Sequence, residues 1–177
     1  MVQTTTSRTS STPAEVARDI FAALVEKDLD AAMALVAEDS VDDFVAIGEI
    51  RGRPAIRAFF DELLTAFPDF DMTVERIVGS ESTAVVQWEA NGTFTGGPFQ
   101  GIDPTRKHAV IRGVDVMDII DGMVRHNTIY YDGASFARQI GLLPRSGSGT
   151  DKAMLSMFNT VTKIRHQLSH AKEGKEA

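Results

Sequence analysis

The chain has 177 residues, of which 43% are apolar and 24% charged, with no cysteine and a net charge of −7. Such totals predict one globular domain with a full core. The lack of cysteine excludes disulfides, thiolate metal sites and cysteine nucleophiles. The acidic balance disfavours nucleic acid binding, which uses clustered Lys and Arg. With neither a secretory apolar region nor a run of about 18 apolar residues, the sequence predicts a cytoplasmic protein that binds no membrane.

The first third of the chain predicts a tail and three helices. Residues 1–12 are mostly Ser and Thr, which is typical of a disordered tail. Thr12-Pro13-Ala14-Glu15 then has the residues of a capping box with proline at the first helical position. A shorter helix is expected over 29–36, followed by a brief strand at SVDDFVAI. In RPAIRAFFDELLTAF the apolar residues recur at spacings of three and four, which predicts a third helix ending before Pro68.

From Phe70 onward the pattern changes to strands rich in β-branched and aromatic residues. The expected strands cover FDMTVERIV, STAVVQWEANGTFT, KHAVIRGVDVMDII and MVRHNTIYY. Asp121-Gly122 between the last two supplies the residues of a tight hairpin turn. The Gly- and Pro-rich segment TGGPFQGIDPTRK predicts a long connection. Helices followed by a strand meander indicate an α+β fold.

The C-terminal part predicts a short helical turn at SFARQIG, a flexible linker over 145–150, and a last amphipathic helix and tail over 151–177. The apolar residues of that helix recur at intervals of three and four and form a narrow stripe: Met154, Met157, Val161, Ile164 and Leu168. We expect the stripe to pack on the sheet of this subunit or of a partner. Its few basic residues disfavour a cofactor-binding or membrane-surface role.

The strand segment GVDVMDIIDG carries two aspartates among apolar residues. An ionised carboxylate taken out of water costs several kcal/mol unless it is paired or its pKa shifts. Strand alternation places Asp115 and Met117 on one face and Asp118 on the other. Because both faces are apolar, the periodicity does not decide which aspartate faces the core.

Several motifs over about residues 14–144 resemble the ketosteroid isomerase, SnoaL-like polyketide cyclase and nuclear transport factor 2 superfamily. RGRPAIRAFF is similar to its third-helix pattern G-x-x-A-I-x-x-F, and AFPDFDM to its F-P-D start of the sheet. GTFTGGPFQGIDPTRK, VIRGVDVMDIIDGMV and YYDGASFARQIGLLP are similar to successive SnoaL-like segments. The resemblance implies a domain over 13–144 in which three N-terminal helices lie against a cone-shaped, curved antiparallel sheet with an open-ended cavity.

The resemblance also implies a catalytic carboxyl pair. Asp115 matches the isomerase aspartate that stays protonated and donates a hydrogen bond to the substrate oxyanion. Asp42 or Asp43 matches the catalytic base of the first strand, and one sequence does not decide between them. Two carboxylates converging in a dry pocket would push their pKa values apart, which suits an acid and a base.

The chain departs from both named activities at several positions. Ile20 and Phe21 stand where the isomerase has its oxyanion-hole tyrosine, and Phe94 stands where the cyclases have histidine. Asn127 and Ile129 stand near the cyclases' last-strand histidine and acid–base aspartate. The residues expected to contact a ligand are Trp88, Phe94, Asn127, Tyr131, Met117 and Phe21.

The sequence thus predicts a cofactor-independent acid–base enzyme, an isomerase or cyclase, acting on a hydrophobic polyketide-like or ring-containing molecule. An epoxide hydrolase or epoxide-opening cyclase is one alternative, and a non-catalytic ligand-binding or assembly protein is another. We expect no cofactor and no metal, since His166 and His170 lack a third ligand. A homodimer formed through the sheet is also expected.

Overall fold

The computed structural model describes residues 11–173, and their side chains as far as Arg165. The expected disordered tail therefore lies almost wholly outside the described residues. The elements in chain order are α1 Pro13–Val25, α2 Leu29–Met33, β1 Val36–Phe44, β2 Gly48–Arg51, α3 Arg53–Ala66, β3 Asp71–Gly79, β4 Thr83–Thr93, β5 His108–Ile120, β6 Met123–Tyr131, α4 Gly133–Gln139 and α5 Gly149–Glu173. The three N-terminal helices and the strand meander are confirmed, and β2 was not expected. The second helix ends at Met33 and not at residue 36, because Val36 already pairs with Val124 as the first residue of β1.

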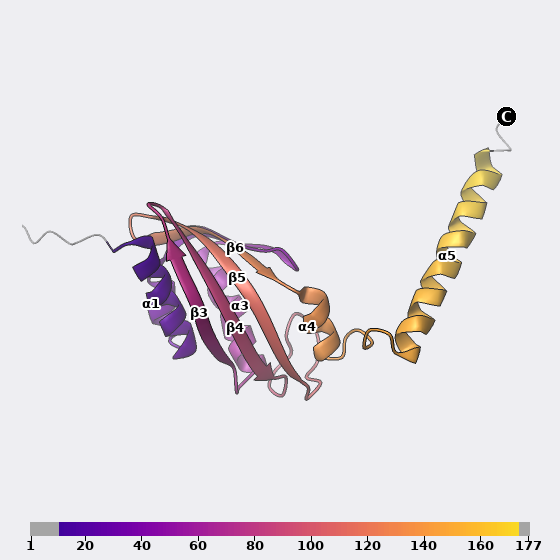
Figure 1. The fold of residues 1–177 in the computed structure, drawn as a ribbon, viewed down its shortest axis with the longest axis horizontal. Coiled ribbons are helices and arrows are strands. Elements are labelled where there is room, and N and C mark those ends of the chain that lie inside the picture. The colour runs from indigo at the N-terminus through magenta and orange to yellow at the C-terminus, as the bar shows by residue number, and fades with distance from the viewer. Residues whose placement is uncertain (1–10, 174–177) are drawn as a thin grey trace, which may run out of the picture.

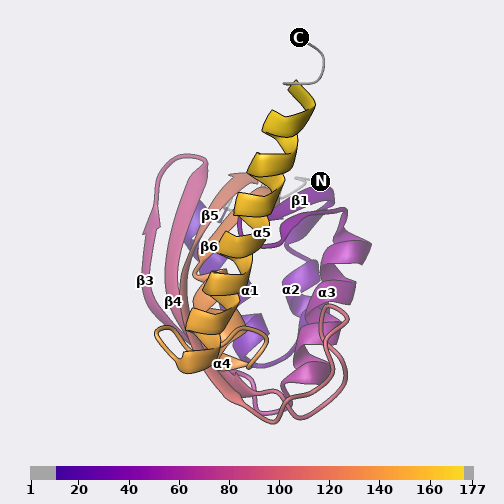
Figure 2. The same cartoon turned by 90° about the vertical axis from the view of Figure 1, so that its right-hand side faces the viewer.

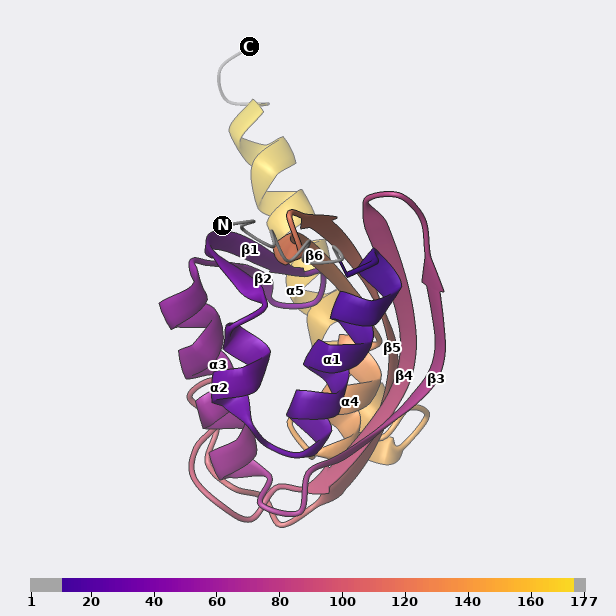
Figure 3. The same ribbon diagram turned by 90° about the vertical axis from the view of Figure 1, so that its left-hand side faces the viewer.

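The strands form one six-stranded sheet in the order β2-β1-β6-β5-β4-β3. Its pairs are antiparallel except β1 and β6, which run parallel. Hairpin signals relate only strands that follow each other in the chain, so they gave no information on this pairing. The sheet curls without closing, and α1, α2 and α3 lie against its concave face (Figures 1 and 3). The core lies between these two layers.

Local signals in the sequence position the first helix on the sheet. The predicted capping box is present: the Thr12 hydroxyl accepts from the Glu15 amide, and the Glu15 carboxylate accepts from the Thr12 amide. The buried face of α1 includes Val16, Ile20 and Phe21. This face contacts β3, β4 and β5. One side of the cavity described below is therefore walled by α1.

The β5–β6 hairpin sets which residues face each other across the sheet. Asp121 and Gly122 have φ angles of 54° and 74°, as a primed two-residue turn requires. The turn, together with a register shift between Asp118 and Ile119, places Asp115 opposite Ile129 and Met117 opposite Asn127. The predicted turn is thus confirmed, and it brings the polar residues of the two strands together.

One end of the cone is covered by the 94–107 connection and by α4. The connection is joined to α3 by a hydrogen bond from the Gly96 amide to the Ala66 carbonyl. Helix α4 is capped by the Asp132 carboxylate and followed by Gly141 at a φ of 85°, close to the predicted end. Phe99 of the connection and Phe136 of α4 lie 6.5 Å apart between ring centroids. These two segments form the outer wall of the cavity.

Helix α5 extends away from the rest of the domain (Figures 1 and 2). Met154, Met157, Val161 and Ile164 are exposed, so the stripe does not pack on the sheet of its own subunit. Burial against a partner stays a prediction, and Leu168, His166 and His170 fall outside the described side chains. The helix begins two residues before the expected start at 151. Within residues 11–173, no helix is long and apolar enough to cross a membrane.

The contact between the 94–107 connection and α3 is tested by replacing Gly96. A Cβ at this position would lie far inside van der Waals distance of the Thr65 carbonyl oxygen. We expect Gly96→Ala to lower the free energy of unfolding by about 1–3 kcal/mol, as overpacking does, measured by urea denaturation. Gly149→Ala is the control because no atom lies within 4 Å of its added Cβ. Equal stabilities of the two variants would contradict the contact.

Candidate active site

Two adjoining cavities lie between the concave face of the sheet and the helices. The outer chamber has a volume of about 100 Å³ and is lined by Phe21, Leu24, Phe44, Phe59, Phe60, Leu63, Phe70, Met72, Trp88, Ala90, Phe99, Ile111, Asp115, Ile129, Tyr131 and Phe136. The inner chamber has about 30 Å³ and is lined by Ile20, Phe21, Leu24, Met33, Val36, Asp42, Ile56, Phe60, Asp115, Met117, Val124 and Asn127. Asp115 borders both chambers. It therefore links the aromatic outer chamber to the inner chamber that contains Asp42 and Asn127.

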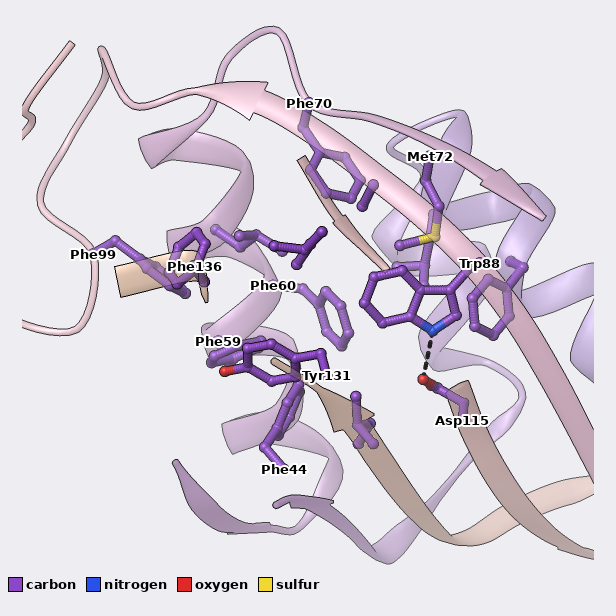
Figure 4. Close-up of a pocket in the computed structure, with 16 residues that line it drawn as sticks. Phe44, Phe59, Phe60, Phe70, Met72, Trp88, Phe99, Asp115, Tyr131 and Phe136 are labelled. Atoms are coloured by element: carbon purple, nitrogen blue, oxygen red, sulfur yellow. Dashed lines mark hydrogen bonds between the residues drawn. The ribbon is translucent and has the colours of Figure 1, made fainter. Parts of the chain in front are cut away.

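The outer chamber has aromatic walls. Nine of its lining residues are Phe, Trp or Tyr, and Asp115 is the only carboxyl among them (Figure 4). The Tyr131 hydroxyl points away from Asp115 (Figure 4), and burial raises the pKa of Tyr131. Flat aromatic faces favour a planar apolar ligand. A ring held here would therefore lie against one acidic group.

The Asp115 carboxyl is buried without a cation. Its side chain is 6% exposed, and none of the ion pairs among the described residues includes it. The Trp88 indole nitrogen donates to Oδ1 at 2.7 Å, and the Asn127 amide nitrogen donates to Oδ2 at 2.8 Å. Burial raises the pKa of Asp115 to about 6, while these two donors act in the opposite direction.

The Trp88 position depends on a glycine in the neighbouring strand. Trp88 on β4 pairs with Gly113 on β5, two residues before Asp115. A Cβ at Gly113 would lie 2.7 Å from Cη2 of the indole. The ring therefore occupies the space that any side chain at 113 would need. Its N–H reaches the carboxyl of Asp115 because this space is free.

The structure distinguishes between Asp42 and Asp43. Asp42 is 5% exposed and borders the inner chamber, whereas Asp43 is half-buried on the opposite face of β1. No hydrogen-bond donor reaches the Asp42 carboxyl within the part of the chain that the structure describes. Burial raises the pKa of Asp42 to about 7, and the nearby charge of Asp115 adds to this increase. Of the two expected candidates, Asp42 is thus the one in the pocket.

Asn127 lies between the two carboxyls. In the parallel β1–β6 pair it is opposite Asp42, and in the β5–β6 pair it is opposite Met117, next to Asp115 on the inner face. Its Nδ2 donates to Asp115, while its Oδ1 is buried and has no hydrogen-bond partner among the described residues. Three polar side chains from three strands therefore converge at the inner chamber.

Of the other residues expected to contact a ligand, all but Phe94 line one of the two chambers. Phe21, Trp88 and Tyr131 line the outer chamber, and Met117 lines the inner one. Phe94 borders neither; it is fully buried and stacks on Phe67 at 5.0 Å between ring centroids. Hydrogen bonds of its backbone with residues 106 and 107 keep Phe94 at the base of the connection.

Most of the aromatic wall was not identified from the sequence. Phe59 and Phe60 lie on the apolar face of α3, which the helical period had assigned only to the core. Phe44, Phe70, Phe99 and Phe136 come from a strand end, a turn, a loop and a short helix. For Phe59 and Phe60 the apolar period of α3 was the one available signal, and it did not distinguish a cavity wall from the core.

The hydrogen bonds around the two carboxyls favour a different division of roles from the one that the resemblance implies. Asp115 was expected to stay protonated and the first-strand aspartate to act as the base. In the structure Asp115 has two donors that stabilise its ionised form, whereas Asp42 has none and also faces the Asp115 charge. The pKa of Asp42 is therefore the higher one, and Asp42 is the carboxyl that stays neutral at higher pH.

The fold and the pocket define a ketosteroid isomerase-like α+β domain with a buried carboxyl pair. The model of the SnoaL-like polyketide cyclase family matches residues 14–140. The chain belongs to this family.

Solved structures show the same fold at low sequence identity. A protein from Jannaschia sp. CCS1, assigned as a SnoaL-like polyketide cyclase, is 20% identical with a TM-score of 0.65, covering 76% of this chain and 97% of its own. AclR from Streptomyces galilaeus, assigned as a hydroxylase, is 20% identical with a TM-score of 0.64, covering 85% and 94%. IdmH from Streptomyces antibioticus, assigned as a polyketide cyclase, is 21% identical with a TM-score of 0.62, covering 74% and 99%. No curated protein matches the chain significantly.

The Trp88–Gly113 contact gives a first prediction for the site. We expect Gly113→Ala to displace the indole, lower the free energy of unfolding by about 1–3 kcal/mol, and shift the fluorescence of Trp88, the only tryptophan of the chain. The free energy is measured by urea denaturation. In Trp88→Phe the smaller ring leaves room, so adding Gly113→Ala to that variant should cost clearly less. Additive effects would contradict the contact.

The buried Asp42 carboxyl predicts a pH-dependent stability. Its pKa is about 7 in the folded protein against an ordinary value of 3.8, so the folded state retains a proton that the unfolded state releases. The stabilisation from the neutral carboxyl is present below about pH 4 and is lost as the pH rises towards 7. Relative to Asp42→Asn, the free energy of unfolding should fall on the order of 3 kcal/mol across this range.

Urea denaturation between pH 4 and pH 8 measures this difference. Asp43→Asn makes the same chemical change on the opposite face of the strand and serves as the control. Parallel pH profiles for the wild type and Asp42→Asn would show that the Asp42 carboxyl ionises as it does in water.

Proposed function

We propose that the protein is a cofactor-independent acid–base enzyme, an isomerase or cyclase, that acts on a compact, hydrophobic, ring-containing molecule of the polyketide type. This proposal rests on one observation: two buried carboxyls border the same chamber beside an aromatic cavity, and no ion pair among the described residues includes either of them. Perturbed carboxyls in a cleft are a recurrent property of catalytic sites. Membership of the SnoaL-like family supports the same class of chemistry.

The pKa order assigns one role to each carboxyl. Asp115, ionised near neutral pH, removes a proton from the carbon next to a substrate carbonyl. The electron pair of the broken C–H bond forms the enol C=C. The carbonyl oxygen, placed where the two chambers adjoin, takes the proton of neutral Asp42 from the inner chamber. An acid and a base whose pKa values lie near the working pH transfer protons efficiently in both directions. Isomerisation follows when protonated Asp115 returns its proton to another carbon and the enol O–H returns its proton to Asp42. Ring closure follows when the enol carbon attacks a second carbonyl, whose oxygen takes the enol O–H proton as the first C=O forms again.

The walls of the outer chamber would orient the substrate. The Trp88 ring, which donates to Asp115, and the Tyr131 ring both line this chamber (Figure 4). The volume of about 100 Å³ is below the roughly 300–1,000 Å³ of usual ligand pockets. A compact substrate suits this volume, and a larger one would need Phe99 and Phe136 at the covered end to move apart.

Epoxide opening is a second candidate with an observation in its favour. Neutral Asp42 could protonate an epoxide oxygen while Asp115 takes a proton from water or from a substrate hydroxyl. The polar inner chamber beside both carboxyls has room for such a small nucleophile. In a purely ligand-binding protein, by contrast, the convergence of the two carboxyls would have no chemical role.

Hydrogen exchange at carbon tests the proposal without knowledge of the natural substrate. In D₂O the protein should accelerate exchange of the protons next to the carbonyl in small cyclic ketones and enones, followed by proton NMR. We expect Asp115→Asn and Asp42→Asn each to slow this exchange by about 10²-fold or more, the usual contribution of a general acid or base.

Matched variants separate catalysis from binding. Asp118→Asn and Asp43→Asn alter the same two strands on their opposite faces and should leave the exchange rate unchanged. Ketones that raise the melting temperature without any exchange above the level of Asp115→Asn would identify a binding protein and contradict the proposed enzyme.

A further inference from the structure

The inner chamber has a size and a polarity that the proposed acid and base do not by themselves explain. Its volume of about 30 Å³ exceeds the roughly 10–15 Å³ that a water molecule needs but is too small for an organic ligand. Its polar lining consists of Asp42, Asn127 and Asp115, and the rest is apolar. A cavity with several convergent polar groups binds water, whereas a purely apolar one of this size stays dry.

Two of the three polar side chains have hydrogen-bonding capacity left over. Asn127 is 5% exposed, and its Oδ1 has no partner. Asp42 is as deeply buried and receives no hydrogen bond from the described residues. A buried polar group without a partner costs roughly 1–3 kcal/mol. Asp42 and Asn127 are opposite each other on β1 and β6, so one small bridging molecule can serve both.

We propose that the inner chamber is a binding site for a water molecule that connects Asp42, Asn127 and Asp115. The water donates to Asn127 Oδ1 and exchanges protons with the two carboxyls. Asn127 is then a positioning residue: its Nδ2 holds Asp115 at 2.8 Å, and its Oδ1 orients the water.

This water lets a proton return from Asp115 to Asp42 after each reaction, an inference that rests on the proposed function. After one ring closure Asp115 carries the proton taken from carbon, and Asp42 has lost its own to oxygen. The water gives a proton to ionised Asp42 and takes one from Asp115. One O–H bond of the water breaks while another forms, so the water is regenerated and the pair returns to its starting state. The substrate in the outer chamber need not leave first.

A crystal structure of the wild-type protein without substrate tests the binding site directly. We expect ordered solvent density within about 3.2 Å of both Asn127 Oδ1 and an Asp42 carboxyl oxygen. In Asn127→Leu this density should be absent. A dry chamber, or an Asp42 carboxyl bonded directly to Asn127 Oδ1, would overturn the proposal. Because no substrate is present, this result is independent of the exchange experiment that tests the enzyme.

Turnover kinetics test the proton path once a substrate is known. We expect Asn127→Leu to lower the ratio of the multiple-turnover rate to the single-turnover rate at least tenfold, since only later turnovers need the returned proton. Taking the ratio cancels any effect of the lost Asp115 hydrogen bond on the chemical step. Thr128→Val, on the opposite face of the same strand, is the control. An unchanged ratio in Asn127→Leu would overturn the path even with the water in place.

Discussion

The burial of two carboxyls in one apolar pocket, where no cation of the described residues pairs with them, is the constraint on which the site depends. An ionised carboxylate in such surroundings is costly, so the protein either supplies hydrogen-bond donors or keeps the group neutral. It does both. Asp115 accepts from Trp88 and Asn127, and the pKa of Asp42 rises to about 7. Two chemically identical groups thereby acquire different proton affinities.

The sheet produces this difference through its register. The four side chains of the site come from four strands that are neighbours in the sheet, and all point to the concave face: Trp88 from β4, Asp115 from β5, Asn127 from β6 and Asp42 from β1. The primed turn at Asp121-Gly122 and the register shift between Asp118 and Ile119 align β5 with β6, and Gly113 leaves the space that the indole fills. A slip of one residue in any of these strands would turn its polar group to the other face.

Local sequence signals predicted much of the fold, whereas the site depends on contacts between residues that are far apart in the sequence. The capping box at Thr12, the period of α3 and the Asp-Gly turn each involve neighbouring residues, and each was confirmed. The parallel pairing of β1 with β6 places Asp42 opposite Asn127, far along the chain, and this pairing decides between Asp42 and Asp43.

The resemblance predicts Asp115 as a site residue but not the hydrogen-bonding environment that favours its ionised form. That property follows from the Trp88 and Asn127 donors, which belong to other strands and which no motif encodes. The aromatic wall was missed for a related reason, since Phe99 and Phe136 reach the cavity from a loop and a short helix whose positions depend on the finished sheet.

Carbon-13 NMR titration of the aspartate carboxyls in the wild-type protein measures the decisive property directly. The account predicts that Asp115 and Asp42 both titrate well above the ordinary value of 3.8, and that Asp42 releases its proton at the higher pH. Titration of both groups near pH 4 would contradict it. So would a pair in which Asp115 is the last to ionise, because the base and the acid would then exchange places.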